Sequence, residues 1–325
     1  MKVVFHGANA ACFLPGFADL LSAQCHVIAL SETLAGPGEV EHYQTADVVI
    51  GIRLDASMPR PTQARLFHAP AAGTDGINTA LLADATALCN CFGHEHAIAE
   101  YVLGALLTRH VPLAAADAEL RQQRWQWFAG RPGATRTELG SQTIGLLGFG
   151  HIGKALAHRA RAFGMRIHAC NRSPVDSPLV DRFWALGALE PFMGSADVIV
   201  VSLPLVPATR GLIGARALAT MRPDALLINV GRGPVIDEQA LFDALSTRRI
   251  GGAVIDTWYR YPTEREPECR PATCDFESLD NVLMTPHMSG WTEGTVRRRQ
   301  QTMADNIARL LARQPLQNVV RPAIA

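Results

Sequence analysis

Runs of almost entirely apolar residues recur along this chain and constrain its fold more than any other feature. In the second half of the chain they occupy residues 143–147, 166–170, 198–203, 225–230, 252–255 and 282–285. Shorter runs in the first half occupy residues 3–5, 26–30, 48–50 and 66–69. Strands that are apolar on both faces are typical of parallel sheets covered by helices on each side. We therefore predict an α/β protein with two Rossmann-like, doubly wound parallel sheets, the first of them flavodoxin-like.

A long helical stretch near the C-terminus predicts that one of the two domains is discontinuous. At 325 residues the chain is long enough for two ordinary domains. A helix at 96–113 is expected to connect them, and a helix at 293–313 is expected to return to the first. We predict a discontinuous domain of residues 1–97 and 291–325 around a continuous domain of residues 98–290.

Charge, cysteine content and hydropathy limit the partners. Lys and Arg together number 30, as do Asp and Glu, so the overall charge favours neither nucleic acid nor a membrane as a partner. The seven cysteines have the spacing of neither a disulfide framework nor a zinc site, so we expect reduced thiols and no metal. The first apolar run is too short for a signal peptide, and no run approaches the roughly 18 residues that span a bilayer. A cytoplasmic protein with a small-molecule partner is expected.

A glycine-rich segment joins the run at 143–147 to a helical stretch. Gly148 permits a tight turn, Gly150 lets the backbone approach a pyrophosphate, and Gly153 allows close packing of helix on strand. The start of the helix supplies N–H groups and positive potential for phosphates. This context predicts a dinucleotide site, formed by Gly148, Phe149, Gly150, His151, Ile152 and Gly153.

The end of the next strand carries the residues that distinguish NAD from NADP. A chain that binds NAD normally has Asp or Glu there, which accepts hydrogen bonds from the ribose hydroxyls. This chain instead has Asn171, Arg172 and Ser173, which offer neutral and cationic donors to a 2′-phosphate. We predict NADP(H) as the preferred cofactor. In the alternative, Arg172 stacks on the adenine or faces solvent, and NAD(H) is accepted as well.

Five motifs follow one another in order along the chain. They are GLLGFGHIG, DVIVVSLPLVPATRGLI, LLINVGRGPVIDEQALFDAL, GGAVIDTW and NVLMTPHMSGWT. Together they resemble the D-isomer-specific 2-hydroxyacid dehydrogenases, which include glyoxylate and hydroxypyruvate reductases, phosphoglycerate dehydrogenases and formate dehydrogenases. The resemblance covers nearly the whole chain and implies an NAD(P)-dependent oxidoreductase acting on a small 2-oxo or 2-hydroxy acid. It also implies that the discontinuous domain binds substrate, that the continuous domain binds the dinucleotide, and that the chain forms a homodimer.

The resemblance places the catalytic residues at the ends of strands. Arg232, in NVGRG, matches the arginine that pairs with the substrate carboxylate and polarises the 2-oxo group. His287, in TPHMSG, matches the acid/base that protonates the carbonyl oxygen as hydride arrives. In the first domain, HAPAAGTDGI resembles a loop whose N–H groups, around Ala72 and Gly73, bind the substrate carboxylate.

Further residues are assigned to the cofactor by the same resemblance. Asp256 matches an aspartate beside the nicotinamide carboxamide, with capping of the following loop as the alternative. Glu100 matches a glutamate at the domain junction, where a structural role is the alternative. The remaining residues implied to contact the cofactor are Leu203, Pro204, Val230, Gly231, His287 and Gly290.

One position departs from the family pattern. The family's glutamate, five residues after the aspartate and followed by proline, raises the pKa of the catalytic histidine through a charged hydrogen bond. Here Tyr261 stands at that position, and a neutral phenol would orient the histidine but stabilise imidazolium less than a carboxylate. Alternatively, the charged loop after it supplies Glu264 or Glu266. The sequence alone does not decide which of the three residues lies beside His287.

These residues together predict a reductase of glyoxylate, hydroxypyruvate or a related 2-oxo acid. Two other functions remain open: a nicotinamide-sensing binding protein with little activity, and a formate- or phosphite-type dehydrogenase on the same scaffold. The presence of both Arg232 and His287 argues against the sensor.

Overall fold

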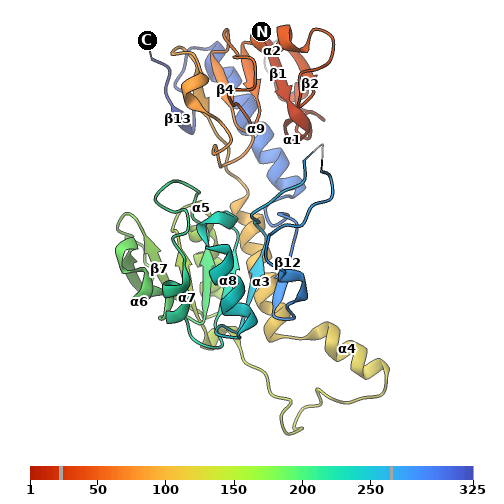
Figure 1. The fold of residues 1–325 in the computed structure, drawn as a ribbon, viewed down its shortest axis with the longest axis vertical. Helices are drawn as coiled ribbons and strands as arrows, with labels where there is room; N and C mark the ends of the chain where they lie inside the picture. The colour runs from red at the N-terminus through yellow and green to blue at the C-terminus, as the bar shows by residue number, and fades with distance from the viewer. Residues whose placement is uncertain (22–24, 264–265, 325) are drawn as a thin grey trace. The chain divides into compact units, whose positions relative to one another are not determined.

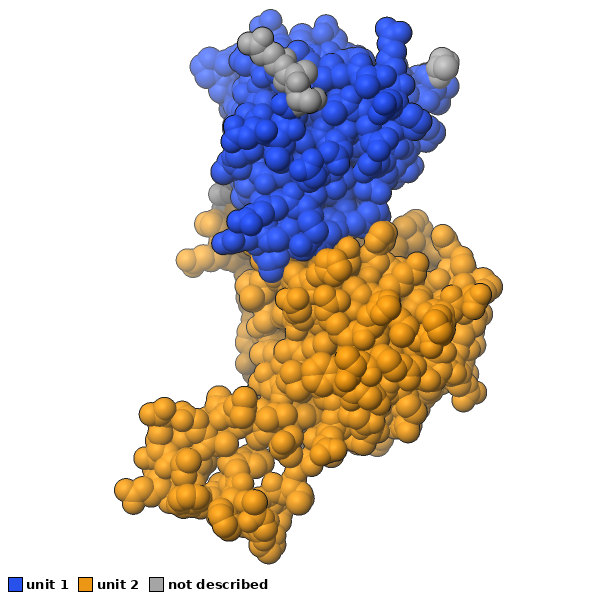
Figure 2. All heavy atoms as spheres, turned by 180° about the vertical axis from the view of Figure 1, so that it is seen from behind, with its two compact units in different colours: residues 1–93, 292–325 blue, residues 94–291 orange. Residues whose placement is uncertain are grey.

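The computed structural model describes residues 1–21, 25–263 and 266–324, and the chain divides into two compact units. Unit 1 holds Met1–Gly93 and Thr292–Ala325, and unit 2 holds His94–Trp291 (Figure 2). Each unit contains its own sheet (Figure 1). The predicted fold class, with two doubly wound sheets and a discontinuous first domain, is confirmed.

Unit 1 is built on a sheet with the strand order β13-β5-β4-β3-β1-β2. All neighbouring strands are parallel except β13, which pairs antiparallel with β5. The order 2-1-3-4-5 of the parallel strands is the flavodoxin-like one. The strands are β1 (Lys2–His6), β2 (His26–Leu30), β3 (Val48–Ile50), β4 (Leu66–His68), β5 (Ala87–Cys89) and β13 (Val319–Arg321), and the helices are α1 (Gly7–Ala11), α2 (Glu39–Gln44) and α9 (Glu293–Leu311).

The first strand shows why these runs are apolar throughout. Val3 and Phe5 are fully buried in a cluster that includes Met303 of α9. Val4, between them, is fully buried in a second cluster that includes Tyr43 of α2. Successive side chains of a strand point to opposite faces, so a helix on each face requires every position to be apolar.

Unit 2 is built on an entirely parallel sheet with the order β12-β11-β10-β9-β6-β7-β8. Strand order reverses at β6, and ligands of such sheets bind at the carboxyl ends of the strands near that point. The strands are β6 (Thr143–Leu147), β7 (Arg166–Asn171), β8 (Arg182–Ala185), β9 (Val198–Val201), β10 (Leu226–Asn229), β11 (Gly252–Ile255) and β12 (Val282–Met284). The helices are α3 (Glu95–His110), α4 (Leu113–Arg121), α5 (His151–Ala162), α6 (Leu189–Met193), α7 (Ala215–Thr220) and α8 (Glu238–Ser246).

The structure differs from the predicted elements in two respects. Strands β5, β8 and β13 lie outside the predicted runs. Strands β8 and β13 are partly exposed strands at the edges of their sheets, whereas β5 is buried and has the same length as the predicted strands β3 and β4. The helix expected at 96–113 ends at His110, and a separate helix begins at Leu113. Pro112 accounts for the break, since proline disfavours helical backbone in the residue before it. No helix of the described residues is both long and apolar enough to cross a bilayer.

Candidate active site

The glycine turn after β6 separates glycines that the fold requires from one that it does not. Gly148 has φ +100°, and a Cβ there would lie 3.0 Å from Ser202 Oγ. A Cβ on Gly153 would lie 2.4 Å from the Gly148 carbonyl oxygen. A Cβ on Gly150, in contrast, would meet no atom of the described residues within 4 Å. The space beside Gly150 therefore fits a ligand that approaches the backbone closely, as a pyrophosphate does.

Helix α5 starts directly at this turn. His151 is its first residue, and the preceding Gly150 provides no side chain to cap it. The first N–H groups of a helix lack acceptors within the helix and carry the positive end of its dipole. The turn thus has the electrostatic character of a phosphate site.

The residues that follow β7 divide into one that supports the turn and two that face solvent. Asn171 Oδ1 accepts a hydrogen bond from Phe149 N at 3.4 Å, and Asn171 Nδ2 donates to Ser173 O at 3.1 Å. Arg172 and Ser173 are exposed. Arg172 therefore lies at the surface, next in sequence to the residue that bonds the glycine turn, and no carboxylate stands among these three residues.

Arg232 lies in a turn whose backbone is held on both sides. Asn229 Oδ1 accepts from Gly231 N at 3.1 Å, and Asn229 Nδ2 donates to the Arg232 carbonyl at 3.2 Å. A Cβ on Gly231 would lie 2.8 Å from Leu203 O, and one on Gly233 would lie 2.3 Å from Trp258 O. The half-buried Arg232 side chain donates from Nη1 to Gly231 O at 2.9 Å. Its position after β10 is therefore fixed by the chain around it.

The other residues predicted to contact the cofactor differ in exposure. Leu203 and Val230 are buried at 7% and 5% exposure, whereas Pro204 is exposed. Gly290 packs against α3, since a Cβ there would lie 3.4 Å from Ile98 Cγ1. Glu100, also on α3, is exposed.

Asp256, at the end of β11, is completely buried and holds the turn that carries His287. Its Oδ1 accepts from Thr285 Oγ1 at 2.6 Å and from Met288 N at 2.9 Å. Its Oδ2 accepts from Ser289 N at 3.0 Å. These are the contacts of a loop cap, the alternative role that the sequence allowed. His287 itself is exposed and has φ +58°.

Of the two candidates within the described residues, Tyr261 and Glu266, the structure places Tyr261 beside His287. The rings of Tyr261 and His287 have centroids 5.5 Å apart at an interplanar angle of 47°. Tyr261 Oη accepts from Trp258 N at 3.0 Å. Glu266 is exposed and pairs with Arg260 at 3.5 Å, and Glu264 lies outside the described residues.

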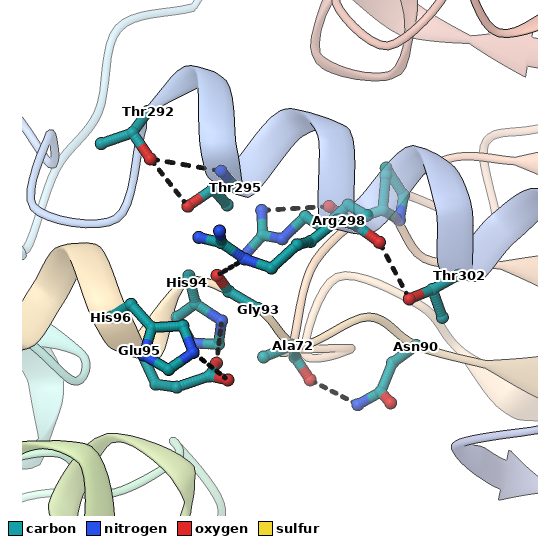
Figure 3. Close-up of polar contacts among 12 residues, drawn as sticks. Ala72, Asn90, Gly93, His94, Glu95, His96, Thr292, Thr295, Arg298 and Thr302 are labelled. Atoms are coloured by element: carbon teal, nitrogen blue, oxygen red, sulfur yellow. Dashed lines mark hydrogen bonds and ion pairs between the residues drawn. The ribbon is translucent and has the colours of Figure 1, made fainter.

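In unit 1, the loop after β4 has its carbonyl groups engaged from three directions. Arg299 Nη1 donates to Pro70 O at 3.1 Å and Cys91 N donates to Ala71 O at 3.0 Å. Asn90 Nδ2 donates to Ala72 O at 2.7 Å (Figure 3). Among the described residues, no acceptor is engaged by the N–H groups of Ala72 and Gly73. In this half-exposed loop the carbonyl groups are therefore engaged, whereas these two N–H groups are not.

Several residues that support these loops have no motif of their own. Asn229 follows the common pattern of an Asn side chain that bonds backbone two residues on, so its position before Gly231 was a usable signal. Asn90 and Thr285 gave no such signal, because their partners lie elsewhere in the chain. Within the described ranges, no group of three or more His, Cys, Asp or Glu side chains is arranged to hold a metal ion.

The chain is similar to known proteins in both sequence and fold. Residues 103–289 match the family model described as D-isomer specific 2-hydroxyacid dehydrogenase, NAD binding domain. The chain is 30% identical over 292 residues to a glycerate dehydrogenase of Methylorubrum extorquens, covering 86% of this chain and 87% of that protein. A D-isomer specific 2-hydroxyacid dehydrogenase from Xanthobacter autotrophicus Py2, solved in complex with NADPH and MES, superposes with a TM-score of 0.79 at 26% identity, covering 99% of this chain and 98% of that chain.

A further relative matches over less of its length. D-3-phosphoglycerate dehydrogenase of Escherichia coli (strain K12) is 32% identical over 205 residues, which cover 62% of this chain and 47% of that protein. The chain thus spans about half the length of this relative. The resemblance inferred from the five motifs is confirmed.

Proposed function

Because the chain belongs to the D-isomer-specific 2-hydroxyacid dehydrogenase family, we propose that it transfers a hydride between nicotinamide C4 and C2 of a small 2-oxo or 2-hydroxy acid of D configuration. One observation carries this proposal. The glycine turn, Arg232 and the His287 turn follow β6, β10 and β12 of a single parallel sheet, so all three lie at the edge where such sheets bind ligands. Unit 2 is then the dinucleotide domain and unit 1 the substrate domain.

The residues of the chain have separate tasks in this reaction. A bound dihydronicotinamide supplies the hydride. The Arg232 guanidinium pairs with the substrate carboxylate and stabilises the negative charge that develops on the 2-oxo oxygen. Protonated His287 donates a proton to that oxygen in reduction, and neutral His287 accepts it in oxidation. The N–H groups of Ala72 and Gly73 bind the carboxylate in unit 1, and Tyr261 orients the His287 ring.

NADP(H) is the proposed preferred cofactor. The exposed Arg172 and Ser173, and the absence of an acid in the segment 171–173, support it. The relative from Xanthobacter autotrophicus binds NADPH in its solved structure. NAD(H) can also bind, because the segment 171–173 carries no group that would repel either cofactor.

The proposed substrate class is glyoxylate, hydroxypyruvate or a related small 2-oxo acid. The relative that matches over 87% of its length is named a glycerate dehydrogenase, and glycerate is the 2-hydroxy acid that forms when hydroxypyruvate is reduced.

Asp256 holds the His287 turn in this proposal. Its carboxylate accepts three hydrogen bonds from the turn, so it can accept one more hydrogen bond from a bound cofactor.

The test is turnover of each cofactor with each substrate. Purified protein is mixed with NADPH or NADH and with glyoxylate or hydroxypyruvate, and the loss of reduced-nicotinamide absorbance is followed. We expect rapid oxidation of NADPH. Arg232→Ala should lower kcat/KM by at least about 100-fold and leave NADPH affinity unchanged, and Arg232→Lys should lie between, since it keeps the charge and loses the planar fork.

The other results of this experiment separate the alternatives. A preference for NADH would keep the enzyme and contradict the role of Arg172. Binding of NADPH without turnover of any 2-oxo acid would favour the sensor, and oxidation of formate or phosphite with reduction of the cofactor would favour that type of dehydrogenase.

A homodimer formed through unit 2 is also proposed. None of the residues of α4 is buried, and Leu113, Leu120, Trp125 and Phe128 are 74%, 52%, 61% and 58% exposed. Several exposed large apolar side chains within one short stretch of sequence are typical of an interface. Light scattering should give a dimer for the wild type and a monomer for Leu120→Glu, with Val206→Glu, exposed elsewhere in unit 2, as the control. A monomeric wild type would contradict it.

A further inference from the structure

The backbone of His287 adopts a conformation that ordinary residues avoid. Its φ of +58° lies in the left-handed region, which side chains with a Cβ enter rarely. Such a conformation persists only where the surrounding structure imposes it. The hydrogen bonds around the turn therefore show what holds the side chain in place.

Asp256 fixes the turn on both sides of His287. After the histidine, Met288 N and Ser289 N donate to its two carboxylate oxygens. Before the histidine, Thr285 Oγ1 donates to Oδ1 at 2.6 Å. His287 N in turn donates to Thr285 O at 3.1 Å. The carboxylate of Asp256 thus binds residues before and after His287, whose backbone is left-handed.

Thr285 is itself held from two further elements. Its single hydroxyl proton is directed to Asp256, so the contact of 2.7 Å with Tyr101 Oη requires the phenol to be the donor. Burial raises the pKa of the Tyr101 phenol above its ordinary value, so the hydroxyl keeps the proton that it donates. The Thr285 carbonyl accepts from Trp258 Nε1 at 2.8 Å. Side chain and backbone of Thr285 therefore have one available orientation.

We propose that Tyr101, Thr285 and Asp256 form a chain of hydrogen bonds that positions His287 for proton transfer, with Thr285 as the link. The inference rests on the proposed function. It makes Tyr101 and Thr285 positioning residues, since they act on the substrate only through the turn. It also gives a direction to the chain: the phenol orders the hydroxyl, and the hydroxyl orders the carboxylate that binds the two N–H groups.

Two variants remove single hydroxyl groups from the chain. Thr285→Val keeps the shape and should lower kcat by about 30-fold, since small displacements of a catalytic group are costly to the rate. Tyr101→Phe should lower kcat by about fivefold, since it removes one hydrogen bond. Thr285→Ser restores the hydroxyl and should recover most of the activity. KM for NADPH should stay unchanged in all three variants.

Matched controls exclude a general effect of losing a hydroxyl. Thr108→Val removes a hydroxyl from the exposed face of α3, where it bonds Gly104 O. Tyr43→Phe removes a buried hydroxyl that has no hydrogen-bond partner among the described residues. Both should keep wild-type kcat.

The double variant and hydrogen exchange test the direction of the chain. Tyr101→Phe should have no further effect on kcat in the Thr285→Val background, because it acts through that hydroxyl. Amide exchange in the peptide spanning residues 285–289 should accelerate in Thr285→Val and not in Thr108→Val. The exchange measurement needs no turnover, so it separates this inference from the proposed function.

Three results would overturn the inference. One is wild-type kcat in Thr285→Val. Another is equal loss in Thr285→Ser and Thr285→Val, which would show that the hydroxyl is not what matters. The third is additive loss in the double variant together with unchanged amide exchange. An inactive wild type with normal protection of the turn would reject the proposed function instead.

Discussion

The His287 turn in unit 2 and the loop at 70–73 in unit 1 are irregular segments that follow parallel strands, yet they are held by opposite chemical groups. In the turn, a buried carboxylate accepts from the N–H groups of Met288 and Ser289. In the loop, donors from Arg299, Cys91 and Asn90 bind three successive carbonyl groups. One segment therefore has its donors occupied, and the other has its acceptors occupied.

This difference decides what each segment presents. With its N–H groups bound to Asp256, the turn offers a side chain, that of His287. With its carbonyl groups bound, the loop offers the N–H groups of Ala72 and Gly73, which suit an anion. The chemistry available at a loop thus depends on which backbone groups the fold has already used.

The largest effect is expected from removing the carboxylate of the turn. Asp256→Ala leaves two N–H groups and one hydroxyl without their acceptor, in a site that is buried at Ser289 and partly buried at Thr285 and Met288. We expect the free energy of unfolding to fall by about 4 kcal/mol, from about 1–3 kcal/mol for each unsatisfied group with partial relaxation. Urea unfolding measures this, with the exposed Asp280→Ala as control. An unfolding free energy within about 1 kcal/mol of the wild type would show that the turn is held in another way.

A pH-dependent effect is expected at the start of the loop in unit 1. Burial lowers the pKa of His68, the last residue of β4, from 6.5 to about 4. The unfolded chain therefore binds a proton more readily than the folded one, so the stability from this group is complete above pH 6.5 and is lost as the pH falls toward 4. Protonation also places a second donor against Asn306 Nδ2, which donates to His68 Nε2 at 2.9 Å.

The size of that effect follows from the shift. A change of this size corresponds to about 3 kcal/mol between neutral pH and pH near 4. Urea unfolding at both pH values should show a larger loss for the wild type than for His68→Gln, whereas His26→Gln, exposed on β2, should behave like the wild type. Equal pH dependence in His68→Gln and the wild type would contradict the assignment.

A smaller effect is expected from reversing the chemistry of the loop. Asn90→Asp replaces the donor to Ala72 O by an acceptor and places negative charge beside the N–H groups proposed to bind a carboxylate. KM for the 2-oxo acid should rise by about 30-fold, the equivalent of about 2 kcal/mol, with unchanged affinity for NADPH. Asn78→Asp is the control, because an aspartate there still accepts from Ala80 N. An unchanged KM would remove the loop from substrate binding.

The smallest effect is expected at Tyr261. Its phenol accepts from Trp258 N, but its side chain is 43% exposed, so water can replace the bond in Tyr261→Phe. Stability should change by less than about 1 kcal/mol, and kcat by no more than about threefold, with the ring still beside His287. If Tyr261→Phe lowered kcat as much as Thr285→Val, Tyr261 and not Asp256 would be the main support of the turn.

The elements that the sequence predicted well are those with both faces buried. The run at 143–147 corresponds to β6, and the run at 252–255 to β11, because both strands lie inside the sheet of unit 2. The edge strand β8 has exposed and buried residues in a short segment, so it contains no apolar run from which it could be predicted. Pro112 was a readable signal for the end of α3, but the apolar residues on both sides of it concealed the break.

The candidate site could be predicted where a residue belongs to a local motif. The glycine turn, Arg232 and His287 each stand in a segment whose order along the chain is informative. Tyr101 and Thr285 are 184 residues apart in sequence, and their contact exists only because α3 packs beside the His287 turn. Local periodicity reports nothing of such pairs, so the support of the site was visible only in the structure.

The most direct test of the account is transfer of a labelled hydride. Protein is incubated with hydroxypyruvate and with NADPH in which both hydrogens at nicotinamide C4 are deuterium, and the product is analysed by mass spectrometry and for its configuration. The account predicts D-glycerate with deuterium at C2. Unlabelled product, the L configuration, or no product while NADPH remains bound would contradict it.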